Sequence, residues 1–148
     1  MYKRQPYLTA TIREILRHRP VLLNAAPRTV KKPIEVGGIE YVPRVHLLAS
    51  AWLVHHDPDI YPEPYAFRPE RFLDTDPGTY TWIPFGGGRR RCIGASFAQM
   101  EMAIVLRELL RTAGIKAGID GPEVTIRRAI TVTPGSGAET VLADRVAA

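Results

Sequence analysis

Residues 85–94 read Phe-Gly-Gly-Gly-Arg-Arg-Arg-Cys-Ile-Gly, and Cys92 within them is the only cysteine of the 148-residue chain. An apolar helical pattern begins just after Cys92, so the thiol is predicted at a helix N-terminus, where negative charge is stabilised. The glycines let the backbone pass close to a flat ligand, Phe85 could cover one of its faces, and the arginines could neutralise anionic groups at its edge. The stretch therefore predicts a loop that presents a thiolate to a large, planar, anionic ligand.

Three other interpretations of Cys92 compete with this one. A lone cysteine is most often an inert, buried apolar residue. A structural zinc site needs about four cysteine or histidine ligands, yet the chain has no second cysteine and only His55 and His56 are adjacent. A phosphate-binding loop would continue into Gly-Lys-Ser or Gly-Lys-Thr, which does not follow the glycines here. Haem, a planar group with two carboxylates whose iron accepts a thiolate, fits the stretch best.

The stretch resembles the cysteine-loop signature of the cytochrome P-450 family, Phe-x-x-Gly-x-Arg-x-Cys-x-Gly. Every specified position is matched, by Phe85, Gly88, Arg90, Cys92 and Gly94. The resemblance implies a haem-thiolate monooxygenase, in which Cys92 is the catalytic residue and the metal ligand of haem b. It also implies a set of cofactor-binding residues, namely Phe85, Gly86, Gly88, Arg90, Cys92, Ile93, Gly94 and Arg28.

Arg28 enters this set because it follows the first predicted helix, where members of the family often place a cation against a haem propionate. Together with Arg90 it would supply two cations for two carboxylates. The alternative is one more surface arginine. Arg44 and His46 depart from the stretch that is usual in the family at that point, which leaves the strand path there open.

A second group of residues suggests a buried charge network. Glu14 and Arg17 lie three positions apart and would face the same side of a helix. Alone, they would more often form an exposed ion pair of about 0.3 kcal/mol. Residues 69–72, Pro-Glu-Arg-Phe, resemble the family segment whose arginine, here Arg71, joins the helical Glu-x-x-Arg pair. The resemblance implies that the three side chains are buried and fully paired behind the haem.

The predicted fold is mainly α with small β-sheets, the C-terminal haem-binding part of the cytochrome P-450 fold, truncated at the N-terminus. Apolar periodicity predicts a first helix that Thr9 or Thr11 caps and Pro20 ends, and a helix over about 94–112. The remaining predicted elements are a hairpin at 33–42, a short buried helix at 47–55, an irregular stretch at 57–84, and strands at 124–132 and 140–142.

Residues 6–148 are expected to be the C-terminal part of a single monooxygenase domain, and residues 1–5 a non-native scar. The resemblance implies that the central helix with its proton-delivering residues is missing, so we expect this chain to be inactive alone. A single cysteine cannot form an internal disulfide, and no apolar run reaches the ~18 residues of a membrane span. A cytoplasmic protein without a membrane span is therefore expected.

The net charge of +5 favours an acidic partner. For the family, the expected partners are an electron donor of the ferredoxin or flavodoxin type, dioxygen and a small apolar organic substrate, and no nucleic acid. Two alternatives stay open: a non-catalytic fragment, and a basic nucleic-acid-binding module that uses the arginines at 89–91. The second lacks the aromatic residues that such modules interleave with their cations.

Overall fold

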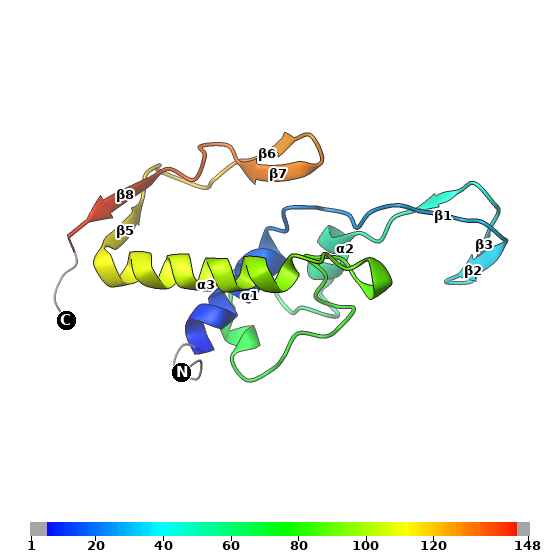
Figure 1. Ribbon diagram of the computed structural model, residues 1–148, viewed down its shortest axis with the longest axis horizontal. Helices are drawn as coiled ribbons and strands as arrows, with labels where there is room; N and C mark the ends of the chain where they lie inside the picture. Colours follow the sequence, from blue (N-terminus) through cyan, green and yellow to red (C-terminus); the bar gives the residue numbers. More distant parts are fainter. Residues whose placement is uncertain (1–5, 145–148) are drawn as a thin grey trace.

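The computed structural model describes residues 6–144, and residues 1–5, which were predicted to be a scar, lie outside the described part. Helices form the centre, and short strand pairs lie around them (Figure 1). In chain order the elements are α1 (Pro6–His18), β1 (Arg28–Thr29), β2 (Ile34–Val36), β3 (Ile39–Tyr41), β4 (His46–Leu47), α2 (Ala51–His55), the 3-10 turns η1 (Pro69–Phe72) and η2 (Gly88–Arg90), α3 (Ala95–Thr112), β5 (Gly114–Ala117), β6 (Thr125–Arg128), β7 (Thr131–Pro134) and β8 (Thr140–Ala143).

The core lies where α1, η1 and α3 meet. The apolar positions of α1 recur at helical spacing, which turns one face of that helix toward η1 and α3. The indole of Trp82 donates to the Arg13 carbonyl over 3.1 Å and ties the irregular segment 57–84 to α1. The buried members of the core are Ala10, Ile12, Leu16, Tyr61, Phe72 and Trp82.

The strands form two-stranded antiparallel sheets within the described residues: β1 with β4, β2 with β3, β5 with β8 and β6 with β7. The predicted hairpin at 33–42 is confirmed, with Val36 opposite Ile39 across the Gly37-Gly38 turn. A hydrogen bond of 2.9 Å from the Val132 amide to the Val21 carbonyl docks the β6–β7 hairpin onto the segment after α1. The hairpin is thereby held beside the core.

Several local expectations were wrong. The helix expected over 47–55 is confined to α2, because His46 and Leu47 pair with β1 instead and the Ser50 hydroxyl accepts the Leu53 amide as the N-cap. Thr9 and Thr11 lie inside α1 rather than at its start, and the Thr11 hydroxyl donates to the Tyr7 carbonyl over 2.8 Å. Both errors concern the boundaries of elements rather than their existence.

The C-terminal tail also differs from the expectation. The single strand predicted over 124–132 is two strands, because Ala129 takes a φ of 56° and turns β6 back into β7. The strand expected at 140–142 exists as β8, but its partner is β5, which the sequence pattern did not indicate. The register Ile115 to Leu142 brings the end of α3 and the end of the described chain together.

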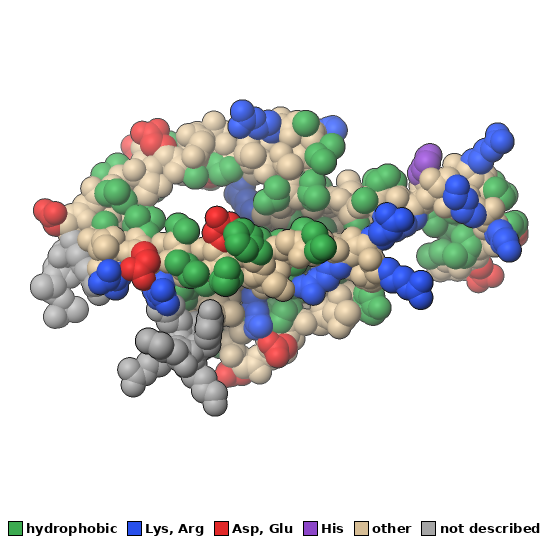
Figure 2. All heavy atoms as spheres, viewed as in Figure 1, with side chains coloured by type: hydrophobic (Ala, Val, Ile, Leu, Met, Phe, Trp, Pro, Cys, Tyr) green, Lys and Arg blue, Asp and Glu red, His purple; other side chains and the backbone are tan. Residues whose placement is uncertain are grey.

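Much apolar surface is uncovered. The chain exposes 11415 Å², whereas a compact monomer of this mass would expose roughly 7,600 Å². Apolar side chains gather along α3 on the face shown in Figure 2. Among the apolar side chains of α3, Phe97 and Val105 are 63% and 55% exposed. None of the helices in the described part is both long and apolar enough to cross a membrane.

Candidate functional site

The cysteine loop, residues 85–94, contains the turn η2 and leads into α3. Gly86 and Gly88 have φ values of 71° and 62°, in the left-handed region where glycine carries no Cβ penalty. These two residues let the chain turn back, so that the Cys92 amide donates to the Phe85 carbonyl over 2.9 Å. The Cys92 thiol is exposed and lies at the head of α3, which begins at Ala95. The positive end of the helix dipole therefore lies next to the sulfur.

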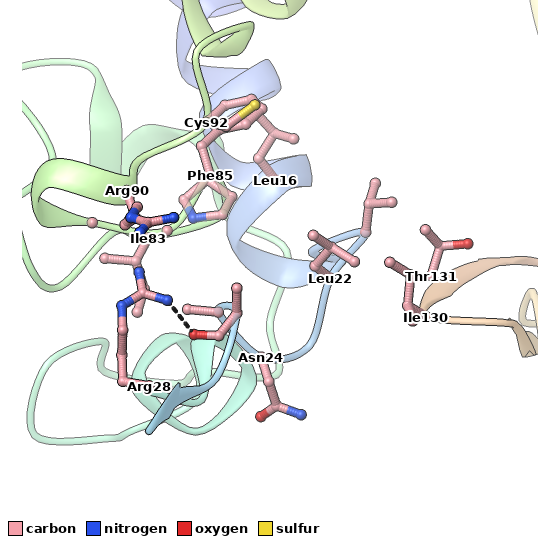
Figure 3. Close-up of a pocket in the computed structure, with 16 residues that line it drawn as sticks. Leu16, Leu22, Asn24, Arg28, Ile83, Phe85, Arg90, Cys92, Ile130 and Thr131 are labelled. Atoms are coloured by element: carbon pink, nitrogen blue, oxygen red, sulfur yellow. Dashed lines mark hydrogen bonds between the residues drawn. The ribbon is translucent and has the colours of Figure 1, made fainter. Parts of the chain in front are cut away.

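A cavity of about 450 Å³ opens beside this loop (Figure 3). Phe85 and Cys92 come from the loop, and Leu16 comes from the core face of α1. Leu22 follows α1, and Ile130 stands at the turn of the β6–β7 hairpin, on the far rim. The cavity thus brings together segments that lie more than 100 positions apart in the sequence, and its walls are mainly apolar.

Two cations stand at the same side of the cavity. Arg28 and Arg90 both line it, and the close-up shows them next to one another, away from Ile130. The Arg28 guanidinium donates to the Ala26 carbonyl over 2.6 Å, which fixes the side chain along the segment before β1. An apolar cavity with a thiol and two guanidinium groups suits a flat apolar ligand that carries carboxylates.

The predicted site residues divide into two groups. Phe85, Gly86, Arg28, Arg90 and Cys92 line the cavity. The other predicted residues do not. Gly88 turns the loop and Gly94 is the N-cap of α3, while the Ile93 side chain is fully exposed and points to solvent.

The structure brings Glu14, Arg17 and Arg71 into one network. Arg17 donates twice to the Glu14 carboxylate, from Nε over 2.7 Å and from Nη2 over 2.8 Å. Nε of Arg71 lies 3.2 Å from Oε1 of the same carboxylate, and the Arg68 amide donates to that oxygen over 2.8 Å. The Glu14 and Arg17 side chains are fully buried, and that of Arg71 is 12% exposed. The carboxylate is therefore surrounded by donors.

Burial alone would raise the pKa of Glu14. Hydrogen bonds from Arg17 and from the Arg68 amide, together with the charges of Arg17 and Arg71, outweigh the burial and leave the pKa of Glu14 below its ordinary value. The Arg17 guanidinium also donates to the His55 carbonyl over 2.6 Å and lies 5.2 Å from the Tyr61 ring centroid. The network is thus a charged and fully paired unit that joins α1 to η1 and to the end of α2.

The family model for cytochrome P450 matches residues 1–134 of this chain. The chain belongs to the cytochrome P450 family. The relative named "Putative cytochrome P450 137", from Mycobacterium tuberculosis (strain ATCC 25618 / H37Rv), is 39% identical over 133 residues, which cover 90% of this chain and 28% of the relative. The chain thus spans less than a third of the length of that cytochrome P450.

Solved cytochromes P450 share the fold. The structure of retinoic acid bound cyanobacterial CYP120A1 matches with a TM-score of 0.85 at 26% identity, over 97% of this chain and 33% of that one. A zebra fish cytochrome P450 with progesterone matches with a TM-score of 0.81 at 28% identity, over 95% of this chain and 32% of that one. The expected partial cytochrome P450 fold, with helices and small sheets, is therefore confirmed.

The residues of this cytochrome P450 fit the haem that the family implies. Gly86 lines the cavity, and a Cβ built on it would meet no atom within 4 Å apart from its chain neighbours, so the cavity is open at this point of the loop. Among the described residues, no group of three or more His, Cys, Asp or Glu side chains could hold a metal ion. Cys92 lines the cavity, and a cysteine thiolate is one of the side chains that ligate haem iron.

Sequence analysis missed other residues of the site. His55 is wholly buried and contacts both the Glu-x-x-Arg helix and the segment before the cysteine loop, yet the sequence showed only an adjacent histidine pair. Leu22 and Ile130 line the cavity from segments whose sequences carry no chemical signal. The cavity wall arises from tertiary contacts, so only the structure identifies it.

Proposed function

We propose that this chain forms the haem-thiolate part of a cytochrome P450 monooxygenase, with the Cys92 thiolate as the axial ligand of haem b. The observation that carries the proposal is the placement of the exposed Cys92 thiol at the head of α3, on an apolar cavity that Arg28 and Arg90 also line. A thiol that served only as packing would instead be buried.

Bound haem would supply the redox chemistry that inserts one atom of dioxygen into an organic substrate. The chain's own residues hold and tune that group. The Cys92 thiolate donates electron density, and Arg28 and Arg90 bind two carboxylates through charge-assisted hydrogen bonds. Phe85 and the other apolar walls exclude water from the site, which strengthens these charge interactions.

The proposed substrate is a small apolar organic molecule, and the proposed electron donor is an acidic protein of the ferredoxin or flavodoxin type. The cavity walls are mainly apolar, and two structural neighbours hold retinoic acid and progesterone, whose carbon skeletons are mostly apolar. The exposed Arg89 and Arg91 on the cysteine loop, with the net charge of +5, suit an acidic donor. The free thiol of Cys92 suits a reducing, cytoplasmic compartment.

We also propose that these 148 residues do not complete a catalytic cycle alone. The cavity is lined by the loop, by α1 with the segment after it and by the turn of the β6–β7 hairpin, while apolar surface along α3 stays uncovered. Surfaces of that kind drive association. Supplied with haem, reductant, dioxygen and an apolar substrate, the chain should consume reductant without coupled formation of hydroxylated product. Coupled turnover by the chain alone would contradict this part of the proposal.

Haem binding can be followed by fluorescence. The Trp82 and Phe85 ring centroids lie 6.2 Å apart, so haem at the cavity should quench Trp82. A Trp52→Phe background removes the other tryptophan, and in it haem should quench the remaining emission to saturation at one equivalent. The Cys92→Ser variant should bind haem at least about tenfold more weakly. Equal titration curves for the two proteins would contradict the assignment of Cys92.

A further inference from the structure

His55, the last residue of α2, contacts two parts of the site that lie far apart in the sequence, the end of α1 and the segment before the cysteine loop. Its ring is wholly buried. Nδ1 lies 3.1 Å from the Arg17 carbonyl oxygen, at the end of α1, and Nε2 lies 2.9 Å from the Ile83 amide nitrogen. A carbonyl only accepts and an amide only donates, so the ring must donate from Nδ1 and accept at Nε2. The two partners thus select one neutral tautomer.

The contact at Ile83 leads directly into the cysteine loop. The Ile83 carbonyl accepts the Gly86 amide over 3.0 Å, and two residues after Ile83 the Phe85 carbonyl accepts the Cys92 amide over 2.9 Å. On its other side, His55 is joined to Arg17 twice, because the Arg17 guanidinium also donates to the His55 carbonyl. The imidazole therefore lies between the Glu14–Arg17 pair and the backbone that holds the thiol.

We propose that His55 is a positioning residue that fixes the cysteine loop on the buried charge network through its Nδ1–H and its Nε2 lone pair. This inference rests on the proposed role of Cys92 as the iron ligand. Without the acceptor at Nε2, the buried Ile83 amide has no partner in the ring, and such a group is expensive to leave unpaired. The backbone at Ile83, two residues before the cysteine loop, then becomes more mobile. The position of the Cys92 thiol relative to α3 is no longer fixed.

The test uses the haem-free chain and amide hydrogen exchange measured by NMR. His55→Phe keeps a ring but removes both polar contacts. His55→Gln reaches as far as Nε2 and can accept the Ile83 amide, whereas His55→Asn reaches only as far as Nδ1. His56→Phe is the matched control, because His56 is also buried and directly follows His55 as the C-cap of α2. Among the described residues, the His56 ring has one hydrogen bond, from Nδ1 to the Trp52 carbonyl of α2 over 2.9 Å.

We expect His55→Phe to accelerate exchange of the Ile83 and Cys92 amides at least about tenfold more than that of Leu16 in α1. His55→Gln should restore most of the protection at Ile83, and His55→Asn should not. A uniform acceleration across the chain, an equal effect of His56→Phe, or no advantage of Gln over Asn would overturn the proposal. The comparison of Gln with Asn stands even where the Phe variant does not fold.

A second readout distinguishes this inference from the proposed function. In haem-loaded samples, the share of the ferrous carbon monoxide complex with the red-shifted thiolate spectrum should fall in His55→Asn and be retained in His55→Gln. If wild-type chain gives no thiolate spectrum, the proposed function fails while the exchange data still decide the role of His55. If wild type gives that spectrum and all His55 variants match it, the positioning role fails alone.

Discussion

Replacing the buried Glu14 should strongly reduce the stability of the fold. Glu14→Gln keeps the shape of the side chain but removes the charge that pairs with Arg17 and Arg71, and it leaves the Arg17 guanidinium buried without a counter-ion. Breaking a buried pair in this way costs about 3–5 kcal/mol. Because unfolding of a domain typically requires only about 5–15 kcal/mol, a large part of the stability should be lost.

Urea unfolding followed by Trp82 fluorescence measures this loss, since Trp82 packs in the core and bonds to α1. With a slope of about 2 kcal/mol per molar urea, the midpoint should fall by about 2 M. Glu108→Gln is the matched control, because Glu108 also pairs with an arginine three residues later, Arg111, and with a second arginine, but on an exposed face of α3. Its midpoint should not move. Equal shifts for Glu14→Gln and Glu108→Gln would refute the reasoning.

Two further predictions concern pH and haem affinity. Burial lowers the pKa of His55 to about 4, below its ordinary 6.5, and burial also lowers the pKa of His56. Between about pH 4 and pH 6.5 the unfolded chain therefore binds more protons than the folded chain. These two histidines should therefore leave the free energy of unfolding unchanged between about pH 6.5 and pH 8 and lower it by about 3 kcal/mol toward pH 4; a flat profile in urea melts between pH 8 and pH 4 would contradict this. Replacing Arg28 or Arg90 by alanine should weaken haem binding about tenfold or more in the fluorescence titration, whereas Arg89→Ala should not, and equal losses for all three would contradict the assignment.

Local sequence patterns were enough to predict the cysteine loop and the helix after it. The fixed positions from Phe85 to Gly94 set the turn, and the apolar spacing that follows sets α3. The placement of Glu14 with Arg71 also followed from a motif, although 57 positions separate the two residues. In each case, the prediction rested on a short segment whose residue types and spacing are specific.

The sequence could not indicate features that depend on pairing between distant segments. α2 starts only at Ala51 because His46 and Leu47 pair with β1, and β5 exists because β8 lies beside it. The contacts of the His55 ring with Arg17 and Ile83 span 38 and 28 positions and involve only backbone groups of the partners. Backbone partners leave no signature in the side-chain pattern, which is why the histidine was overlooked.

The most direct measurement is the absorption spectrum of the reduced, haem-loaded chain under carbon monoxide. If the Cys92 thiolate binds the iron, the wild-type chain should show the far-red-shifted Soret band of a haem-thiolate complex. Cys92→Ser and Cys92→His should both lack that band while retaining the circular dichroism of the helices. A red-shifted band that persists in the serine variant, or a wild-type spectrum identical to that of the histidine variant, would contradict the assignment of Cys92 as the iron ligand.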